Sequence, residues 1–316
     1  MNRIKFSFVI PVYNVKDWLE QCVNSVLSQN YDPNLLEIIL VDDGSVDGSG
    51  SLCDSLAEKN SLIKVVHKAN GGLSDARNVG MLYVSGDYIF FLDSDDYIEP
   101  ESCSKFEEKI EACKVKPDIV TGATCRQSQE KKEIILRKSA SDSVITGTDY
   151  LKNELKSNFF VTVWSSIYRR DFLMANNLQF KKGYIHEDED FTPKAFLVAE
   201  NVLCTNIVFY NYIIREGSIT TSSNKTKNAK CIYEISKDLL NIYDEILDKE
   251  LRDLLYLHTA KICYKAIIDA RLDKKKNRYI VDSSVLKKTS VRCPEKIKYI
   301  LWSISPTVFH LASKLK

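Results

Sequence analysis

The fold of this chain is decided by Ile89-Phe90-Phe91-Leu92-Asp93-Ser94-Asp95-Asp96. Its four apolar residues predict a buried strand, and three carboxylates follow within four positions. In an open α/β sheet, ligands bind at the carboxyl ends of the strands. Crowded carboxylates repel one another unless a cation offsets their charge, so Mg²⁺ or Mn²⁺ bridging to a phosphate is one expectation. The alternative is an acidic loop that caps the helix expected to begin near residue 100.

Strands and helices alternate around this stretch. Strands are expected at residues 6–13, 36–43, 63–67, 89–92 and 118–121, and helices at 16–29, 49–59, 74–84 and 100–113. This alternation predicts an α/β fold, with a mostly parallel sheet and helices on both faces. Ser74 is a candidate N-cap for the third helix. Neither GxGxxG nor GxxxxGK[ST] occurs, so neither a dinucleotide-binding fold nor a P-loop is supported.

The second half of the chain changes in texture. We expect an edge strand at 131–137, a helix at 193–198 and a strand at 202–214, followed by long helices at 231–247 and 251–272. A segment rich in Ser, Asn, Lys and Thr at 222–227 predicts a domain boundary there. A second acidic cluster, Glu187–Asp190, precedes the helix expected at 193.

Composition limits the classes of protein that are plausible. The chain has 316 residues, of which 44% are hydrophobic, enough for a sizeable core. Its nine cysteines form no CxxC pair, which favours reduced thiols and a cytoplasmic protein. No signal region and no apolar run long enough to span a bilayer is visible. We expect no nucleic acid as a partner.

Net charge is unevenly distributed. Residues 274–316 hold eleven Lys/Arg and two Asp/Glu, a net charge of +9, whereas the whole chain carries only +1. Lysines flank an apolar and aromatic run at 296–316, which Pro306 interrupts. This pattern suits the headgroup region of an anionic membrane surface. A terminal helix packed on the protein's own core is the alternative.

Several polar and aromatic groups are predicted to meet at one edge of the sheet. Tyr13 offers an aromatic face, Asp43 a carboxylate that can accept from an imide or a ribose hydroxyl, and Asp93–Asp96 a metal site. Arg77 adds a cation near the expected position of phosphates. Together they suit a nucleoside diphosphate. The alternatives are half-buried packing for Tyr13 and a solvated helix face for Arg77.

Four segments, in order, resemble the successive motifs of the family-two glycosyltransferases. They are Phe8-Val9-Ile10-Pro11-Val12-Tyr13-Asn14, Val41-Asp42-Asp43-Gly44-Ser45, Gly72-Leu73-Ser74-Asp75-Ala76-Arg77-Asn78 and Leu92-Asp93-Ser94-Asp95-Asp96. The resemblance covers residues 5–220. It implies a GT-A fold and an inverting, metal-dependent transfer of sugar from a nucleotide sugar, expected to be a UDP-sugar, to a hydroxyl of a glycan or lipid-linked acceptor.

The resemblance also implies roles for particular residues. His186-Glu187-Asp188 resembles the family's Glu-Asp motif, which makes Asp188 the catalytic base, with Asp190 and Glu187 as alternatives. Asp95, assisted by Asp93 and Asp96, would hold Mn²⁺ or Mg²⁺. The expected donor-binding residues are Pro11, Tyr13, Asp43, Gly72, Arg77, Asp93 and Arg215, the last in a segment that would close over the pyrophosphate.

On the acceptor side the expectations are less specific. Glu187, His186 and Trp164 would contribute there, although His186 suits a hydrogen-bonded structural role and Trp164 suits buried packing. We expect a catalytic domain at 1–222, with a nucleotide-sugar half at 1–121 and an acceptor half at 122–222. A helical region with the basic tail follows at 223–316. Its helices either pair with a second subunit, giving a homo-oligomer, or cover the catalytic domain.

Two rival functions fit the same scaffold. A sugar-nucleotide nucleotidyltransferase would also bind a nucleotide and Mg²⁺ at these strand ends. It would require an early segment rich in Gly and Arg/Lys, which residues 11–16 do not supply. A non-catalytic nucleotide-sugar-binding scaffold is the second rival, and the two intact acidic clusters argue against it.

Overall fold

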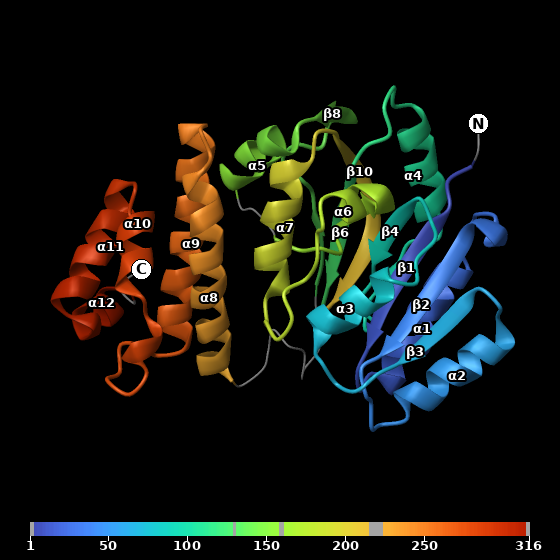
Figure 1. The fold of residues 1–316 in the computed structure, drawn as a ribbon, viewed down its shortest axis with the longest axis horizontal. Coiled ribbons are helices and arrows are strands. Elements are labelled where there is room, and N and C mark those ends of the chain that lie inside the picture. Colours follow the sequence, from blue (N-terminus) through green and yellow to red (C-terminus); the bar gives the residue numbers. More distant parts are fainter. Residues whose placement is uncertain (1–2, 129–130, 158–160, 215–223, 314–316) are drawn as a thin grey trace. The chain divides into compact units, whose positions relative to one another are not determined.

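The computed structural model describes residues 3–128, 131–157, 161–214 and 224–313 (Figure 1). These residues form two compact units, residues 1–154 with 160–216, and residues 155–159 with 217–316. The predicted boundary at 222–227 lies partly outside the described residues. The functional division of the predicted domains therefore remains a prediction.

A mixed sheet forms the body of the first unit. The strands are β1 (Phe6–Val12), β2 (Leu36–Asp42), β3 (Ile63–His67), β4 (Tyr88–Phe91), β5 (Tyr97–Ile98), β6 (Ile119–Gln127), β7 (Lys132–Ile135), β8 (Ser143–Ile145), β9 (Ser166–Arg169) and β10 (Val202–Ile213). They lie in the order β3-β2-β1-β4-β9-β6-β10-β5, with β7 beside β6 and β8 beside β10. The pairings from β3 to β4 are parallel, as predicted, whereas β9 is antiparallel to both β4 and β6. The chain segments that follow β1, β2 and β4 therefore share one edge.

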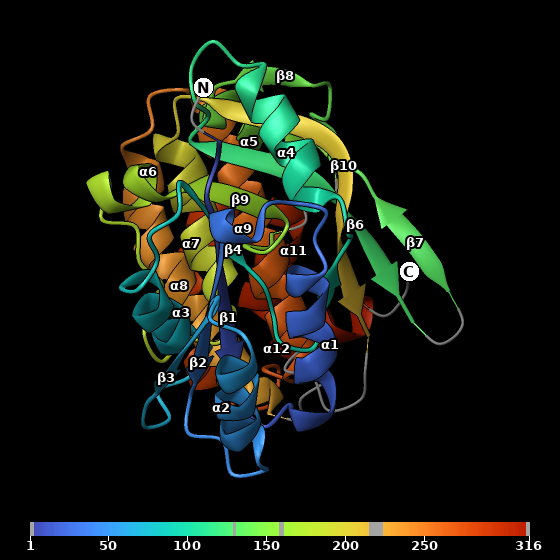
Figure 2. The same ribbon diagram turned by 90° about the vertical axis from the view of Figure 1, so that its right-hand side faces the viewer.

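Helices cover both faces of this sheet (Figure 2). They are α1 (Lys16–Leu27), α2 (Ser49–Lys59), α3 (Leu73–Met81), α4 (Ser102–Glu111), α5 (Gly147–Leu155), α6 (Arg170–Ala175) and α7 (Glu187–Val198), with a short 3₁₀ turn at Pro33–Leu35. On one face, Phe90 stacks on Phe8 at 4.5 Å and meets Phe106 of α4. On the other face, Phe91 meets Phe191 of α7. Because side chains alternate along a strand, neighbouring phenylalanines of β4 serve opposite faces.

Helix α3 packs directly on strands β1 and β2. Ala76 packs in a buried cluster with Ile39 and Val41 of β2. Gly80 faces β1, and a Cβ at this position would overlap the Cγ1 atom of Val9. The absence of a side chain at position 80 therefore sets the distance between α3 and β1.

Two helix boundaries differ from the predictions. Helix α3 begins at Leu73, and its N-cap is Gly72, whose positive φ of 86° is a backbone conformation that favours glycine. The prediction of Ser74 as N-cap was therefore wrong. Helix α7 begins at Glu187, six residues before the predicted start, so the second acidic cluster forms its first turn. Carboxylates are favoured there because they face the positive end of the helix dipole.

The second unit is helical among its described residues. Its helices are α8 (Lys225–Asp244), α9 (Lys249–Asp269), α10 (Ser283–Thr289), α11 (Cys293–Ile304) and α12 (Pro306–Ala312), with a 3₁₀ turn at Arg278–Ile280. The predicted interruption at Pro306 is confirmed, because this residue begins α12. None of the described helices is long and apolar enough to cross a membrane.

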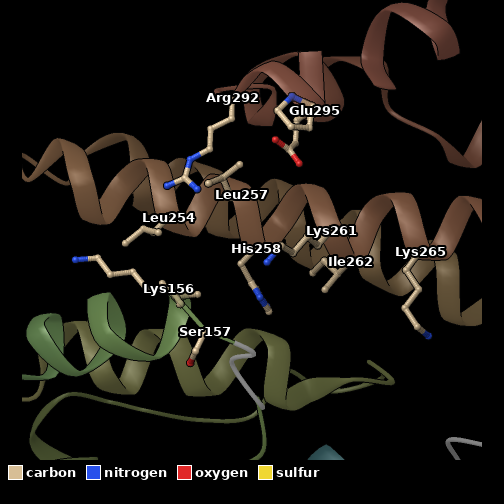
Figure 3. A pocket seen from close by; sticks show the side chains of 12 residues that line it. Lys156, Ser157, Leu254, Leu257, His258, Lys261, Ile262, Lys265, Arg292 and Glu295 are labelled. Atoms are coloured by element: carbon tan, nitrogen blue, oxygen red, sulfur yellow. The ribbon is translucent and has the colours of Figure 1, made fainter. Parts of the chain in front are cut away.

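A basic pocket of about 450 Å³ opens on the second unit (Figure 3). Its floor is apolar, with Leu254, Leu257 and Ile262 of α9. Its charged lining residues are Lys156, Lys261, Lys265, Arg292 and the buried Glu295. None of the predicted site residues lines it, so the candidate site is built elsewhere, at the strand ends of the first unit.

Candidate active site

The first acidic turn follows strand β4 directly. The backbone amide of Asp96 donates to the carbonyl of Asp93 at 3.0 Å, which closes the turn. Asp93 and Asp95 are partly exposed, whereas Asp96 is buried. The three carboxylates predicted to act together therefore lie in different environments.

Asp96 anchors this turn to strand β10. Its Oδ2 accepts from the hydroxyl of Tyr210 at 2.8 Å, and its Oδ1 accepts from the amide of Ile213 at 2.8 Å. Tyr210 also accepts from the amide of Asp93 at 3.2 Å. Burial, followed by the neighbouring charges of Asp95 and Asp93, raises the pKa of Asp96 well above its usual range. Asp96 was predicted to assist in metal binding, whereas here both of its oxygens accept hydrogen bonds from β10.

Arg77 bridges the two acidic clusters. It is only 1% exposed. Its Nη2 lies 2.6 Å from Asp93 Oδ1 and its Nη1 lies 2.5 Å from Glu187 Oε1. Burial alone would lower the pKa of Arg77, but Asp93 and Glu187 outweigh it and raise that pKa, so the guanidinium remains charged. The predicted contact of Arg77 with phosphate remains a prediction; here the side chain lies between two carboxylates.

The second acidic turn opens helix α7. His186, the N-cap residue, has φ of 67°, a conformation that is uncommon outside glycine and is often found at functional sites. Asp190 is buried, and both of its oxygens accept from Lys194 Nζ, at 2.7 and 2.8 Å. Asp188 is half-buried. This burial is the main cause that raises the pKa of its carboxyl well above the usual range, and the charge of Glu187 is the next. A base with a raised pKa is better matched to proton transfer near neutral pH.

Trp164 packs behind the first acidic turn. It is 5% exposed and stacks on Tyr210 with ring centroids 4.3 Å apart. Tyr212 continues the stack at 5.4 Å from Trp164. Its predicted contribution to an acceptor pocket remains a prediction, and its observed contacts support the tyrosine that holds Asp96.

Asp43 holds the loop that leads to helix α3. Its Oδ1 accepts from the amide of Gly71 at 2.8 Å and from Lys68 Nζ at 2.5 Å, and its Oδ2 accepts from the amide of Gly72 at 2.7 Å. Asp43 is 3% exposed. A carboxylate has about four acceptor positions, so these three bonds leave its predicted contact with a nucleotide open.

The remaining described residues that were predicted to bind the donor are at the end of β1 and at the start of α3. Pro11 is buried in β1 opposite Val41, and Tyr13 follows β1 with its ring 51% exposed. Space is open around the Cα of Gly72, where a Cβ would meet no heavy atom within 4 Å. Arg215 lies outside the described residues.

The structure thus brings together Asp93, Arg77 and Glu187, which are far apart in sequence. Sequence reasoning missed Tyr210 and Lys194, the partners of the two buried aspartates. Lys194 lies four residues after Asp190 on a helix, a spacing that pairs charges and could have been found. Nothing in the local sequence around Tyr210 indicates its partner.

The carboxylates present fit a divalent cation that arrives with a phosphate. Within the described ranges, no group of three or more His, Cys, Asp or Glu residues could hold a metal by itself. Mg²⁺ at nucleotide sites is usually bound by one or two carboxylates together with substrate phosphates and water. Asp95 and Asp93 supply such a set of hard oxygen donors.

Comparisons with solved structures show the fold. The chain is similar to residues 1–349 of TarS from Staphylococcus aureus, a structure determined in complex with UDP-GlcNAc, with a TM-score of 0.67 at 20% identity over 90% of this chain and 80% of that one. It is also similar to the mannosyltransferase PcManGT from Pyrobaculum calidifontis, in complex with GDP-Man and Mn²⁺, with a TM-score of 0.58 at 14% identity over 99% and 87% of the two chains. The predicted GT-A fold with a helical C-terminal extension is confirmed.

Sequence comparisons show the family. The family model described as "Glycosyl transferase family 2" matches residues 7–175. The uncharacterized glycosyltransferase EpsJ from Bacillus subtilis is 34% identical over 218 residues, which cover 68% of this chain. The match spans 62% of the length of EpsJ. The chain therefore belongs to glycosyl transferase family 2.

Proposed function

We propose that this protein transfers a sugar from a nucleotide sugar to an acceptor hydroxyl in a single displacement that inverts the anomeric centre. The observation that carries the proposal is the pair of acidic turns joined by Arg77, one at the end of β4 and one at the start of α7. One turn suits the leaving diphosphate and the other suits the attacking hydroxyl. An inverting displacement requires these two functions on opposite sides of the sugar.

Asp95 and Asp93 would hold Mn²⁺ or Mg²⁺. When bound, the cation would offset the negative charge that develops on the departing diphosphate. Arg77 occupies Oδ1 of Asp93 and so fixes the orientation of this carboxylate. Asp96 would act indirectly, by holding the turn in place through Tyr210.

Asp188 is the proposed catalytic base. The two buried carboxylates of its turn are held by partners, because Glu187 pairs with Arg77 and Asp190 pairs with Lys194. Asp188 would accept the proton of the acceptor hydroxyl as the hydroxyl attacks the anomeric carbon. Its raised pKa supports this role.

The proposed donor is a UDP-sugar, held by the residues at the ends of β1 and β2. Tyr13 would stack on the base, and Gly72 would allow the diphosphate to approach the backbone near the start of α3. Pro11, Asp43 and Arg215 keep the donor-binding roles that the family resemblance implies. TarS, which has the higher TM-score of the two neighbours described above, was solved with UDP-GlcNAc, and this supports UDP; PcManGT was solved with GDP-Man.

A panel of nucleotide sugars, with and without Mn²⁺, tests this function. Thermal unfolding should shift upward for the cognate donor, because a ligand that binds only the folded state stabilises it. The same donor should release UDP slowly in the absence of acceptor. Release of pyrophosphate from a sugar phosphate and a nucleoside triphosphate would instead identify a nucleotidyltransferase. Binding without release of any product would identify a scaffold.

We also propose that the acceptor is lipid-linked and that the second unit meets an anionic membrane surface. Three isoleucines on one face of α11 are exposed, Ile297 by 53%, Ile300 by 52% and Ile304 by 75%. Their spacing of three and four residues places them in one stripe. The opposite side of these last helices is anchored in the unit by buried Trp302 and Phe309. The stripe is therefore a stable surface feature.

Charge around this stripe favours anionic lipid. The described part of residues 274–316 contains nine Lys/Arg. Of its two acidic residues, Asp282 pairs with Lys237 and Glu295 is buried. Each cation that reaches an anionic surface contributes roughly 1 kcal/mol. A second copy of the chain is the competing partner for the same stripe.

Co-sedimentation with vesicles tests the membrane proposal. The triple variant Ile297→Ser, Ile300→Ser, Ile304→Ser should remain in the supernatant under conditions where the wild type pellets with anionic vesicles at low salt. A control with three exposed apolar residues of the first unit changed to Ser, at Val46, Leu82 and Val115, should pellet like the wild type. Wild-type protein that stays in the supernatant refutes the proposal, as does a triple variant that merely converts a dimer to a monomer.

A further inference from the structure

The segment that leads to the proposed base lies along one helix of the nucleotide half. Residues 180–187 comprise the last part of the connection between α6 and α7 and the first residue of α7, and they are close to the polar side of α3. Every polar residue from position 74 to 78 of α3 contacts this segment. The pairs are Ser74 with Tyr184, Asp75 with Lys182, Arg77 with Glu187, and Asn78 with Phe180.

The contact between Asn78 and Phe180 is the most specific of these. The side-chain Nδ2 of Asn78 donates to the carbonyl of Phe180 at 2.7 Å, and the amide of Phe180 donates to Asn78 Oδ1 at 2.8 Å. The two bonds reproduce the pairing that a neighbouring strand would provide. They fix the backbone at position 180, where the ring of Phe180 also packs against Arg77 at 5.3 Å.

The same helix holds the loop on the donor side. Lys68 Nζ lies 2.5 Å from Asp43 and 2.8 Å from Asp75 of α3. On its other oxygen, Asp75 pairs with Lys182 at 2.5 Å. A continuous set of contacts therefore runs from Asp43, through α3, to the segment that leads to Asp188.

We propose that α3 positions the base relative to the donor, with Asn78 and Arg77 as positioning residues that act through Asp188. This inference rests on the proposed function, since it assumes that Asp188 is the base. Neither residue needs to touch the substrate. Their effect would be on where the carboxylate of Asp188 lies, and a displacement of about 1 Å in such a group can cost on the order of 10²-fold in rate.

Asn78→Asp is the variant that isolates this effect. It keeps an acceptor for the amide of Phe180 and replaces the donor to its carbonyl with an oxygen. We expect kcat to fall by roughly 10-fold or more, while the Kd of UDP in Mn²⁺ changes by less than about 2-fold. The matched control is Asn176→Asp, because Asn176 Nδ2 also donates to a carbonyl, that of Phe172 within its own helix. This control should leave kcat unchanged.

A double-mutant cycle separates positioning from general damage. If Asn78 acts through the base, Asn78→Asp should lower kcat no further in a chain that already carries Asp188→Asn. Additive losses would overturn the proposal, as would a loss of UDP affinity equal to the loss of kcat. Lys182→Gln, which removes the ion pair between a surface lysine and the buried Asp75, gives a milder test of the same kind. A wild-type protein without donor turnover would refute the proposed function itself, which is a different result from a normal Asn78→Asp variant.

Discussion

The two acidic turns of this protein place their carboxylates in the same three kinds of environment, but they differ in which residues hold the buried carboxylate. In each, one carboxylate pairs with Arg77, Asp93 in the first turn and Glu187 in the second. In each, another is buried and held by its surroundings, and a third is partly exposed. The buried ones are Asp96 and Asp190, and the partly exposed ones are Asp95 and Asp188.

The anchors come from different distances along the chain. Asp190 is held by Lys194, four residues away on the same helix. Asp96 is held by neutral donors from β10, more than a hundred residues away. The buried carboxylate of the second acidic turn is therefore held from within its own helix, whereas that of the first turn is held by a strand far away in the sequence. Two clusters that look alike in sequence thus hold their buried carboxylates by different means, although both also depend on Arg77.

The largest expected effect is that of Asp95→Asn. The variant should lose turnover by about 10³-fold or more, because a bound cation contributes several kcal/mol to stabilising the leaving diphosphate. It should also weaken UDP binding in Mn²⁺, measured by calorimetry. The exposed Asp171→Asn serves as the control. Full activity of the Asp95→Asn variant, or of the wild type in EDTA, would contradict the metal role.

Asp188→Asn should separate the second turn from the first. We expect kcat to fall by at least ~10²-fold, the usual contribution of a general base, with UDP binding in Mn²⁺ nearly intact. Steady-state kinetics and calorimetry on the same preparation check this. Glu200→Gln, at an exposed carboxylate just after α7, is the control. If transfer survives in Asp188→Asn and fails in a folded Asp190→Asn variant, the base lies two positions further on.

The dependence of kcat on pH should reflect the raised pKa of Asp188. Only the carboxylate form accepts a proton, so kcat should fall as the pH decreases through that pKa, well above the range of an ordinary aspartate. The groups around it are Glu187 and Glu189, which raise the pKa, Arg77, which lowers it, and the buried Tyr168. Glu187→Gln should move this acidic limb to lower pH because one repelling charge is gone. A limb that persists unchanged in Asp188→Asn would assign it to another group.

The smallest expected effect is on stability, and it compares the residues that hold the two buried aspartates. Tyr210→Phe removes one donor to the buried Asp96 and should destabilise the protein by about 1–3 kcal/mol, the cost of an unsatisfied buried acceptor. Urea unfolding measures it. Lys194→Gln, beside the equally buried Asp190, is the companion variant for the local anchor. An unchanged stability in Tyr210→Phe would show that the first acidic turn does not depend on the hydroxyl of Tyr210, and that the amide of Ile213 is its sufficient anchor on β10.

Local patterns predicted much of this molecule. The strands from β1 to β4 and the helices between them follow from alternation and apolar runs, and the four motifs at their ends follow from sequence alone. The start of α7 was missed because four consecutive acidic residues suggest a loop, although the helix dipole favours them in a first turn.

Partner choice could not be predicted in the same way. Arg77 was expected to face phosphates, and its burial between Asp93 and Glu187 depends on a packing of segments more than a hundred residues apart. Likewise Asp43 was expected to contact a ligand and no protein partner was predicted for it, whereas in the structure it accepts from Lys68 and from two glycine amides. A sequence indicates which groups need partners, and only the fold determines which partners they find.

Gly80 gives this helix a particular vulnerability to variation. An alanine there would overlap Val9, so α3 would have to move away from β1 as a rigid body. That movement would carry Asp75, Arg77 and Asn78 with it, and every contact they make with either half of the site would shift together. A residue that contacts no substrate thus affects the geometry of the whole site. In a screen for activity, we expect that even Gly80→Ala is not tolerated.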